Sequence, residues 1–310
     1  MANITAKDVA ELRAKTGAGM MDCKKALVEA DGNLEEAVKI LREKGLSAAA
    51  KKQSRIAADG LVDILKEGNI TAMIEVNTET DFVAKNDLFK EFVKNTLAVI
   101  IKERPTTVEE LANAKYDDAM TVNDKLQELI FIIKEKITIR RFVVFEGVTG
   151  TYIHGIGAIG VVVAFDADEA AINNAGFPEF AKNIALQVAA VEAAPYLDRA
   201  SVPTSVIEEE KNIIRSQIAN DPKNAKKPAN IIDKMIDGKI GKFYENNCLV
   251  EMEYFKDDDL KVSQYIANTA KELGGNIAIK SFCRYDKGEG IQKREDNFAE
   301  EIAQLTKGAN

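Results

Sequence analysis

The chain has 310 residues and a mass of 34.0 kDa, which suggests about two or three domains with buried cores. Its composition, 46% hydrophobic and 30% charged, is that of a soluble globular protein. Its formal net charge of -8, without a dense block of Lys and Arg, argues against direct nucleic-acid binding as the main task.

The N-terminus has no apolar signal region, and no apolar run approaches the roughly 20 residues of a membrane span. The three cysteines, Cys23, Cys248 and Cys283, are far apart and form no CxxC motif. They are typical of free thiols in a reducing compartment. We therefore expect a cytoplasmic protein, bacterial or a processed organellar form, with no membrane contact.

Residues 1–45 are expected to form three short helices. Thr5 is placed to cap the first, and the glycine-rich turn at residues 16–19 ends it. Asn33 and Glu36 form a capping-box pattern that opens the third, which is expected to end at residues 44–45 before a helical connector at 46–56. Met20 and Met21 are adjacent, so both cannot face so small a core. One is therefore either an ordinary exposed residue or an adaptable contact for a partner.

A β-hairpin is expected next, with strands at residues 57–65 and 70–77, followed by a long helix over residues 88–101. The turn between them carries Thr80, Asp81, Phe82 and Val83. Thr80 or Asp81 could cap a helix whose first core residue is Phe82. Alternatively, Asp81 and Phe82 form a projecting wedge, one negative charge beside one large apolar ring. The pair alone does not decide between these interpretations.

Two further helices, at residues 108–115 and 122–137, and a strand at 138–145 complete this unit. An internal repeat then begins, because Phe-Lys-Glu-Phe-Val-Lys-Asn at residues 89–95 is echoed by Phe-Pro-Glu-Phe-Ala-Lys-Asn at 177–183, an offset of 177 − 89 = 88 residues. Each copy follows a β-rich segment, which predicts two related sheet-plus-helix subdomains in one α+β core. The second copy has Asp-Ala-Asp at residues 166–168 and lacks the wedge.

The sequence Gly-Ile-Gly-Ala-Ile-Gly at residues 155–160 matches the GxGxxG pattern of dinucleotide-binding proteins. That chemistry requires a helix to follow, whereas residues 161–165 are strand-forming, so a glycine-rich hairpin explains the pattern better. His154, the only histidine, has no metal-ligand partners at suitable spacing. A hydrogen-bonded hairpin position is its simpler interpretation, and a partner contact is the alternative. We expect no metal site, no cofactor and no catalytic residues.

The last third of the chain is expected to begin with a protruding helical hairpin, inserted at about residues 198–237, that serves as a self-association arm or a spacer. Phe243 is expected to lead into a strand at residues 248–255, and the acidic run at 257–259 to form a solvated turn. A helix ending at 273, a strand at 277–285 and a C-terminal amphipathic helix at 297–306 are expected to follow. The predicted domains are residues 1–55, 56–147, 148–285 and 286–310.

Several motifs along the chain together carry a family resemblance. The first signature is Leu12-Arg13, Thr-Gly-Ala-Gly-Met-Met-Asp-Cys-Lys-Lys-Ala-Leu at residues 16–27, and Leu41-Arg42 with Lys44-Gly45. The second is Glu-Val-Asn at 75–77 with Thr-Asp-Phe-Val-Ala at 80–84, and weaker landmarks are residues 188–190 with Pro195, 242–244 and 288–291. Together these motifs resemble the elongation factor Ts family. The chain departs from that family at Thr78, where Cys is usual, and at Ala158, where Arg is frequent.

The resemblance implies a guanine-nucleotide exchange factor for elongation factor Tu, the GTPase that delivers aminoacyl-tRNA in translation. It also implies an N-terminal UBA-like module and a core that together grip this GTPase. In the family the Asp-Phe pair intrudes near the Mg²⁺ site, which here would be the role of Thr80, Asp81, Phe82 and Val83. Arg13, Met20, Met21 and His154 are the candidate docking residues.

Two other classes of function remain open on the residues alone. A nucleotide-binding enzyme that uses residues 155–160 would bind nucleotide without a partner. A scaffold, or a chaperone that forms a homodimer through the helical arm, would bind a GTPase or itself without changing nucleotide release.

Overall fold

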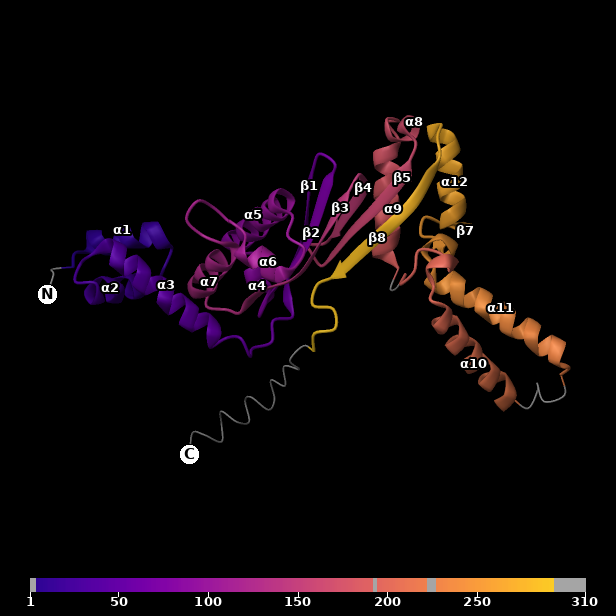
Figure 1. Ribbon diagram of the computed structural model, residues 1–310, viewed down its shortest axis with the longest axis horizontal. Helices are drawn as coiled ribbons and strands as arrows, with labels where there is room; N and C mark the ends of the chain where they lie inside the picture. Colours follow the sequence, from indigo (N-terminus) through magenta and orange to yellow (C-terminus); the bar gives the residue numbers. More distant parts are fainter. Residues whose placement is uncertain (1–3, 192–193, 222–226, 293–310) are drawn as a thin grey trace.

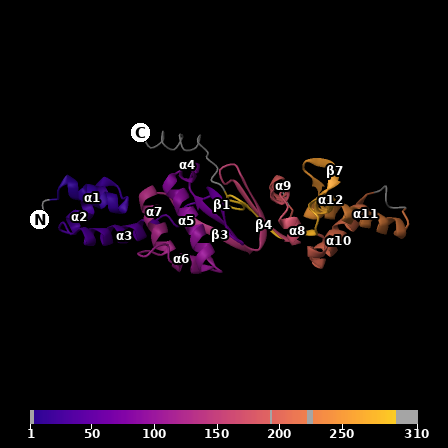
Figure 2. The same cartoon turned by 90° about the horizontal axis from the view of Figure 1, so that it is seen from above.

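The computed structural model describes residues 4–191, 194–221 and 227–292. The molecule is elongated, with three helices at one end, two small sheets in the middle and a pair of helices at the other end (Figures 1 and 2). The predicted mixed α+β class is confirmed. None of the helices in the described part of the chain is both long and apolar enough to cross a membrane.

The N-terminal helices are α1 (Ala6–Thr16), α2 (Met20–Glu29) and α3 (Leu34–Ala50). The predicted end of the third helix at residues 44–45 is wrong, because α3 continues through Gly45, which is buried against Phe131 of α7 (Val122–Ile133). This packing offsets the low helix propensity of glycine. Phe131 is 8% exposed and lies in the same apolar cluster as Leu12 and Cys23. The three helices are therefore not free-standing, since a core residue completes their interior.

Each half of the core is a three-stranded antiparallel sheet with helices on one face. The first sheet has the order β1 (Asp59–Glu67), β2 (Ile70–Thr78) and β3 (Ile137–Glu146), and its helices are α4 (Asp81–Ala84), α5 (Asp87–Glu103), α6 (Val108–Asn113) and α7. The second sheet has the order β4 (Val148–His154), β5 (Ile159–Ala167) and β8 (Ile277–Asp286), and its helices are α8 (Glu169–Ile172), α9 (Phe177–Ala190) and α12 (Val262–Leu273).

The two halves repeat each other in detail. The short helices α4 and α8 begin 169 − 81 = 88 residues apart, which is the offset of the sequence repeat. Phe89 and Phe92 of α5 are buried in the first core, as are Phe177 and Phe180 of α9 in the second. Each sheet also has one irregularity in the ladder to its last strand, at Glu75/Val76 and at Ala164/Phe165.

The two sheets pack face to face, so the core has helices outside and sheets inside. Val62, Met73, Val162 and Tyr285 form the apolar layer between them. β2, the central strand of its sheet, is thus covered on both faces, and every residue of it after Ile70 is buried. The β4–β5 turn lies against β1, where the Val62 amide donates to the Gly157 carbonyl at 2.8 Å.

Gly157 is required at this contact, and its substitution should weaken the fold. Its φ is +70°, and an added Cβ would lie 2.7 Å from the Val62 carbonyl oxygen and from Leu61 Cβ. Gly155 in the same turn also has a positive φ, +60°, but its nearest neighbour would be Ala158 Cβ at 3.8 Å. We expect Gly157→Ala to lower the free energy of unfolding in urea by about 2 kcal/mol, and Gly155→Ala by about 1 kcal/mol. Equal losses would show that close approach to β1 is unimportant.

The helices at the far end are α10 (Thr204–Asn220) and α11 (Ala229–Asn247), which pack through Ile214, Ile218, Ile236 and Ile240. α11 runs beyond the predicted limit of 237 and includes Phe243. The strand predicted for the segment after it, residues 248–255, is wrong for most of its length. One 3-10 turn (Arg199–Ser201) precedes α10, and another (Leu249–Glu251) lies within that segment. Only β6 (Glu253–Tyr254) forms a strand there. It pairs with β7 (Asp257–Lys261), so the acidic run predicted as a turn is a strand.

The predicted C-terminal helix at 297–306 lies outside the described residues.

Candidate functional site

Phe82 projects from the core at the short helix α4. Its side chain is 77% exposed, whereas Val83 and Ala84, which follow it, are buried in the core. The interpretation of Phe82 as a first core residue is therefore wrong. Phe82 is therefore an exposed apolar projection on a backbone that two buried neighbours anchor.

Asp81 lies beside Phe82 and is also exposed. Its carboxylate accepts a hydrogen bond from Lys85 Nζ at 2.7 Å, and the same ammonium lies 5.8 Å from the Phe82 ring centroid. The bond from Lys85, with a smaller contribution from the positive charge of Lys287, holds the pKa of Asp81 below its usual range. The projection therefore pairs an apolar ring with a carboxylate that is ionised at neutral pH.

Thr80 begins α4, but within the described part of the chain its side chain accepts no capping hydrogen bond from that helix. Instead, its hydroxyl and its amide both donate to the carboxylate of Glu135. The predicted capping role of Thr80 is therefore replaced by a link to the segment that follows α7.

Arg13, Met20 and Met21 come together in the N-terminal helices. All three line one open groove between α1 and the start of α2. Met20 is 59% and Met21 63% exposed, so neither methionine enters the core of these helices. Two flexible thioethers beside a guanidinium are a suitable surface for an apolar partner patch with an acidic rim.

His154 lies apart from that groove, at the end of β4. It is exposed, and its Nδ1 lies 3.2 Å from the Tyr152 hydroxyl. The glycines that follow it form a tight turn into β5, with no helix between. The hairpin interpretation of residues 155–160 is confirmed, and the arrangement that a bound dinucleotide needs is missing there.

The Phe82 projection and the His154 hairpin lie on the same edge of the core. Thr78, just before the projection, pairs with Asp59, whose carboxylate binds Lys287 Nζ at 2.7 Å. The Lys287 amide donates to the Ala158 carbonyl of the hairpin turn at 2.9 Å. These contacts therefore connect the first half of the core to the second at this edge.

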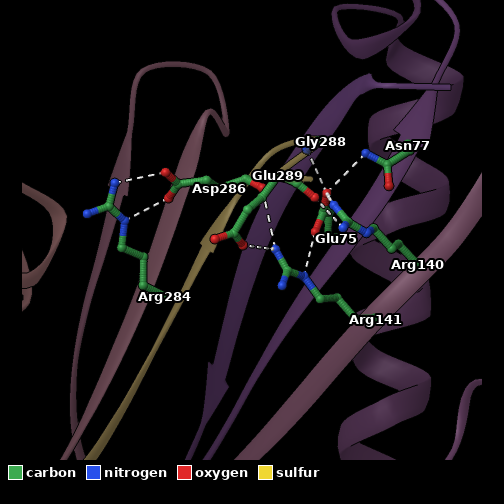
Figure 3. A network of polar contacts seen from close by, with 8 residues as sticks. All are labelled: Glu75, Asn77, Arg140, Arg141, Arg284, Asp286, Gly288 and Glu289. Carbon is green, nitrogen blue, oxygen red and sulfur yellow. Dashed lines mark hydrogen bonds and ion pairs between the residues drawn. The ribbon is translucent and has the colours of Figure 1, made fainter. Parts of the chain in front are cut away.

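A buried charge network supports this edge from inside (Figure 3). The Glu75 side chain is fully buried and accepts from Arg140 at 3.0 Å and from Arg141 at 2.6 Å. It also accepts from Asn77 at 3.1 Å and from the Gly288 amide at 2.8 Å. Arg141 in turn binds the Glu289 carboxylate at 3.0 Å. Residues 288–289, which follow β8, are thereby attached to the first sheet.

The irregularity in the ladder explains why two successive arginines reach one carboxylate. Glu75 pairs with Arg141 and Val76 with Ile139, so Arg140 is an extra residue in β3. Successive side chains of a regular strand point to opposite faces, and a bulge removes that alternation. Burial by itself raises the pKa of the Glu75 carboxyl, but the donors Gly288, Asn77, Arg140 and Arg141 together outweigh it and hold the pKa below its usual range.

The sequence analysis did not predict this network, although the sequence contains one signal of it. A glutamate within the otherwise apolar strand at residues 70–76 is a signal of a paired buried charge. No group of three or more His, Cys, Asp or Glu side chains that could hold a metal ion occurs among residues 4–191, 194–221 and 227–292. The edge of the core at α4 instead presents the ionised carboxylate of Asp81 and the exposed ring of Phe82.

Comparison with known proteins identifies one family. The family model described as "Elongation factor TS" matches residues 79–289. The chain is 45% identical over 312 residues to elongation factor Ts of Clostridium kluyveri, covering 98% of this chain and 99% of that protein. It is 44% identical over 308 residues to elongation factor Ts of Syntrophotalea carbinolica, with the same coverage, and 45% identical over 309 residues to that of Clostridium botulinum, covering 96% and 97%. The chain belongs to the elongation factor Ts family.

Proposed function

We propose that this chain accelerates GDP release from elongation factor Tu by inserting the Phe82 projection beside the Mg²⁺ ion of that GTPase. Its family is that of a nucleotide exchange factor of translation elongation. The observation that supports insertion of Phe82 is its exposure, 77%, on a helix whose next two residues are anchored in the core. Such a ring can displace a partner segment without rearrangement of its own backbone.

The physical basis is linkage between two binding equilibria. Mg²⁺ bridges the bound phosphates to a GTPase, so its displacement removes charge compensation that holds GDP. In this proposal Phe82 supplies the steric displacement, and the ionised Asp81 perturbs the polar groups around the ion. If factor and nucleotide weaken each other's binding, the coupling is reciprocal, and GTP then drives the factor off.

The remaining site residues act in docking. Arg13, Met20 and Met21 would hold the GTPase domain from the N-terminal helices, which we propose form a UBA-like module. His154 would contact the same partner from the second half of the core. We further propose that the chain works in the cytoplasm, and that the α10–α11 arm serves for homodimer formation or as a spacer.

The test is the release rate of a fluorescent GDP from elongation factor Tu, with and without this chain, at fixed Mg²⁺. A large acceleration at substoichiometric amounts of the chain is expected. Binding without acceleration would mean a scaffold, and an absence of binding would refute the proposal.

The docking role of the methionines predicts a loss of affinity. The double substitution Met20→Ala, Met21→Ala should weaken the nucleotide-free complex about 30-fold, because each Met buried at an interface contributes on the order of 1 kcal/mol or more. Titration calorimetry measures this affinity. Val28→Ala is the control, since Val28 is 57% exposed on α2 and does not line the groove. A double variant with unaltered affinity would remove the methionines from the interface.

A further inference from the structure

The chain that follows α7 contacts both proposed partner-binding surfaces. α7 ends at Ile133, and the residue that caps it is Lys134, a non-glycine residue with φ +69°. Lys134 Nζ lies 3.3 Å from the Asp22 carboxylate of α2 and 3.8 Å from the Phe131 ring centroid. This end of α7 is thus attached to the helix that carries Met20 and Met21.

The next two residues bind the base of the Phe82 projection. The Glu135 carboxylate accepts from the Thr80 amide at 3.0 Å and from the Thr80 hydroxyl at 2.7 Å. The Lys136 amide donates to Glu79 at 2.6 Å, and Lys136 Nζ donates to the carbonyls of Gln53 and Arg55 in the connector from α3. Arg55 also forms an ion pair with Glu79 at 3.1 Å, so Lys136, Arg55 and Glu79 all contact one another.

The ring itself has little to hold it. With 77% of its surface exposed, Phe82 takes its direction from its backbone rather than from packing. On the C-terminal side that backbone is anchored by Val83 and Ala84, which are buried. On the N-terminal side the residue before Asp81 is Thr80, whose donors both go to Glu135.

We propose that Glu135 is a positioning residue, which fixes Thr80 and so holds the Phe82 ring in the orientation needed to act on the partner. The expected effect on GDP release rests on the proposed exchange function. The constraint that Glu135 places on Thr80 does not depend on that function. Two charge-assisted hydrogen bonds to one residue constrain both its backbone and its side chain. An interaction that only orients the projecting ring should affect the rate of nucleotide release more than the affinity for the partner.

The kinetic test uses Thr80→Val, Glu135→Ala and the double variant. Fluorescent GDP release from elongation factor Tu is measured while the factor is titrated, which yields a maximal rate and a half-saturating concentration. We expect each variant to lower the maximal rate about 10-fold and to change the half-saturating concentration by less than about 3-fold. The double variant should be no slower than Glu135→Ala, because Thr80→Val removes only the hydroxyl bond, one of the two bonds that Glu135→Ala already removes. Thr80→Ser keeps the hydroxyl and should recover most of the rate lost in Thr80→Val.

The matched control is Glu128→Gln, which removes a carboxylate of α7 whose ion pair is with Lys125 at 2.8 Å. It should release GDP at the wild-type rate. A variant of Glu135 that raised the half-saturating concentration but kept the maximal rate would overturn the inference, because Glu135 would then be a docking residue. Additive losses in the double variant would overturn it as well.

A second measurement on the isolated chain separates this inference from the proposed function. Amide hydrogen exchange across residues 79–86 should be faster in Glu135→Ala than in the wild type, while exchange in β1 and β2 is unchanged. If wild type does not accelerate GDP release, the exchange-factor proposal fails, and this measurement still decides on positioning. Unchanged protection of residues 79–86 in Glu135→Ala would refute the role of Glu135.

Discussion

Phe82→Ala should lower the maximal rate of GDP release from elongation factor Tu at least about 10-fold, a loss of about 1.4 kcal/mol in transition-state stabilisation or more. The side chain is exposed, so its removal should change the free energy of unfolding by less than about 0.5 kcal/mol. The repeat supplies an internal precedent for a stable variant. Ala170 occupies the corresponding place in α8, at an offset of 170 − 82 = 88 residues, and α8 forms the same short helix.

The role of Mg²⁺ can be tested with the same variant. If Phe82 acts by displacing the ion, the difference between wild type and Phe82→Ala should shrink when EDTA has already removed Mg²⁺ from elongation factor Tu. Leu88→Ala is the control for loss of an exposed apolar side chain near the site, since Leu88 is 49% exposed on α5. Wild-type release rates from Phe82→Ala at millimolar Mg²⁺ would refute the assignment of this residue.

Glu75→Gln should destabilise the chain by about 4 kcal/mol, the largest effect on stability that we expect from one substitution. The amide keeps the shape of the carboxylate but removes its charge, so Arg140 loses the carboxylate that it pairs with, and Arg141 keeps only its ion pair with Glu289. The NH₂ group also brings a donor where the carboxylate accepts several hydrogen bonds. Urea unfolding of the two proteins at pH 7 measures the difference.

The pH dependence gives the matching signature. Because the pKa of Glu75 is lowered in the folded chain, its contribution to stability is fully present above the unfolded value of about 4.3 and is lost as the pH falls through the folded value. The stability gap between wild type and Glu75→Gln should therefore be constant above about pH 5.5 and narrow below about pH 4. A gap that stayed constant to pH 3 would mean that the carboxylate is not what the network requires.

The helices and strands of the core were largely predictable because their signals are local. Apolar periodicity and turn residues marked β1, β2, α5 and the β4–β5 hairpin, and the repeat of two Phe-rich helices predicted the duplication. The errors occur where tertiary packing overrides a local signal. Gly45 lies within α3 because α7 packs on it, and the acidic residues at 257–259 form a strand because Tyr254 pairs with Asp257.

The site was predictable in part. The motifs at residues 12–13, 16–27 and 80–84 selected Arg13, Met20, Met21, Asp81 and Phe82, and the structure places each on the surface. Glu135 carries no such signal, since a lone Glu after a helix is typical of a solvated turn. Its role depends on a contact with Thr80 across |135 − 80| = 55 residues, which no local pattern encodes.

The late position of β8 has a consequence for biosynthesis. The second sheet receives its third strand only when residues 277–286 have been made, and Glu75 receives the Gly288 amide only after that. A nascent chain that ends before this point can form the first sheet but leaves the layer around Val62 and Met73 without Tyr285. Domains commonly fold from the N-terminus during synthesis. Here closure of the core waits until residues 277–288 have left the exit tunnel, so we expect a chain terminated upstream of β8 to expose this apolar layer and aggregate rather than act as a shortened factor.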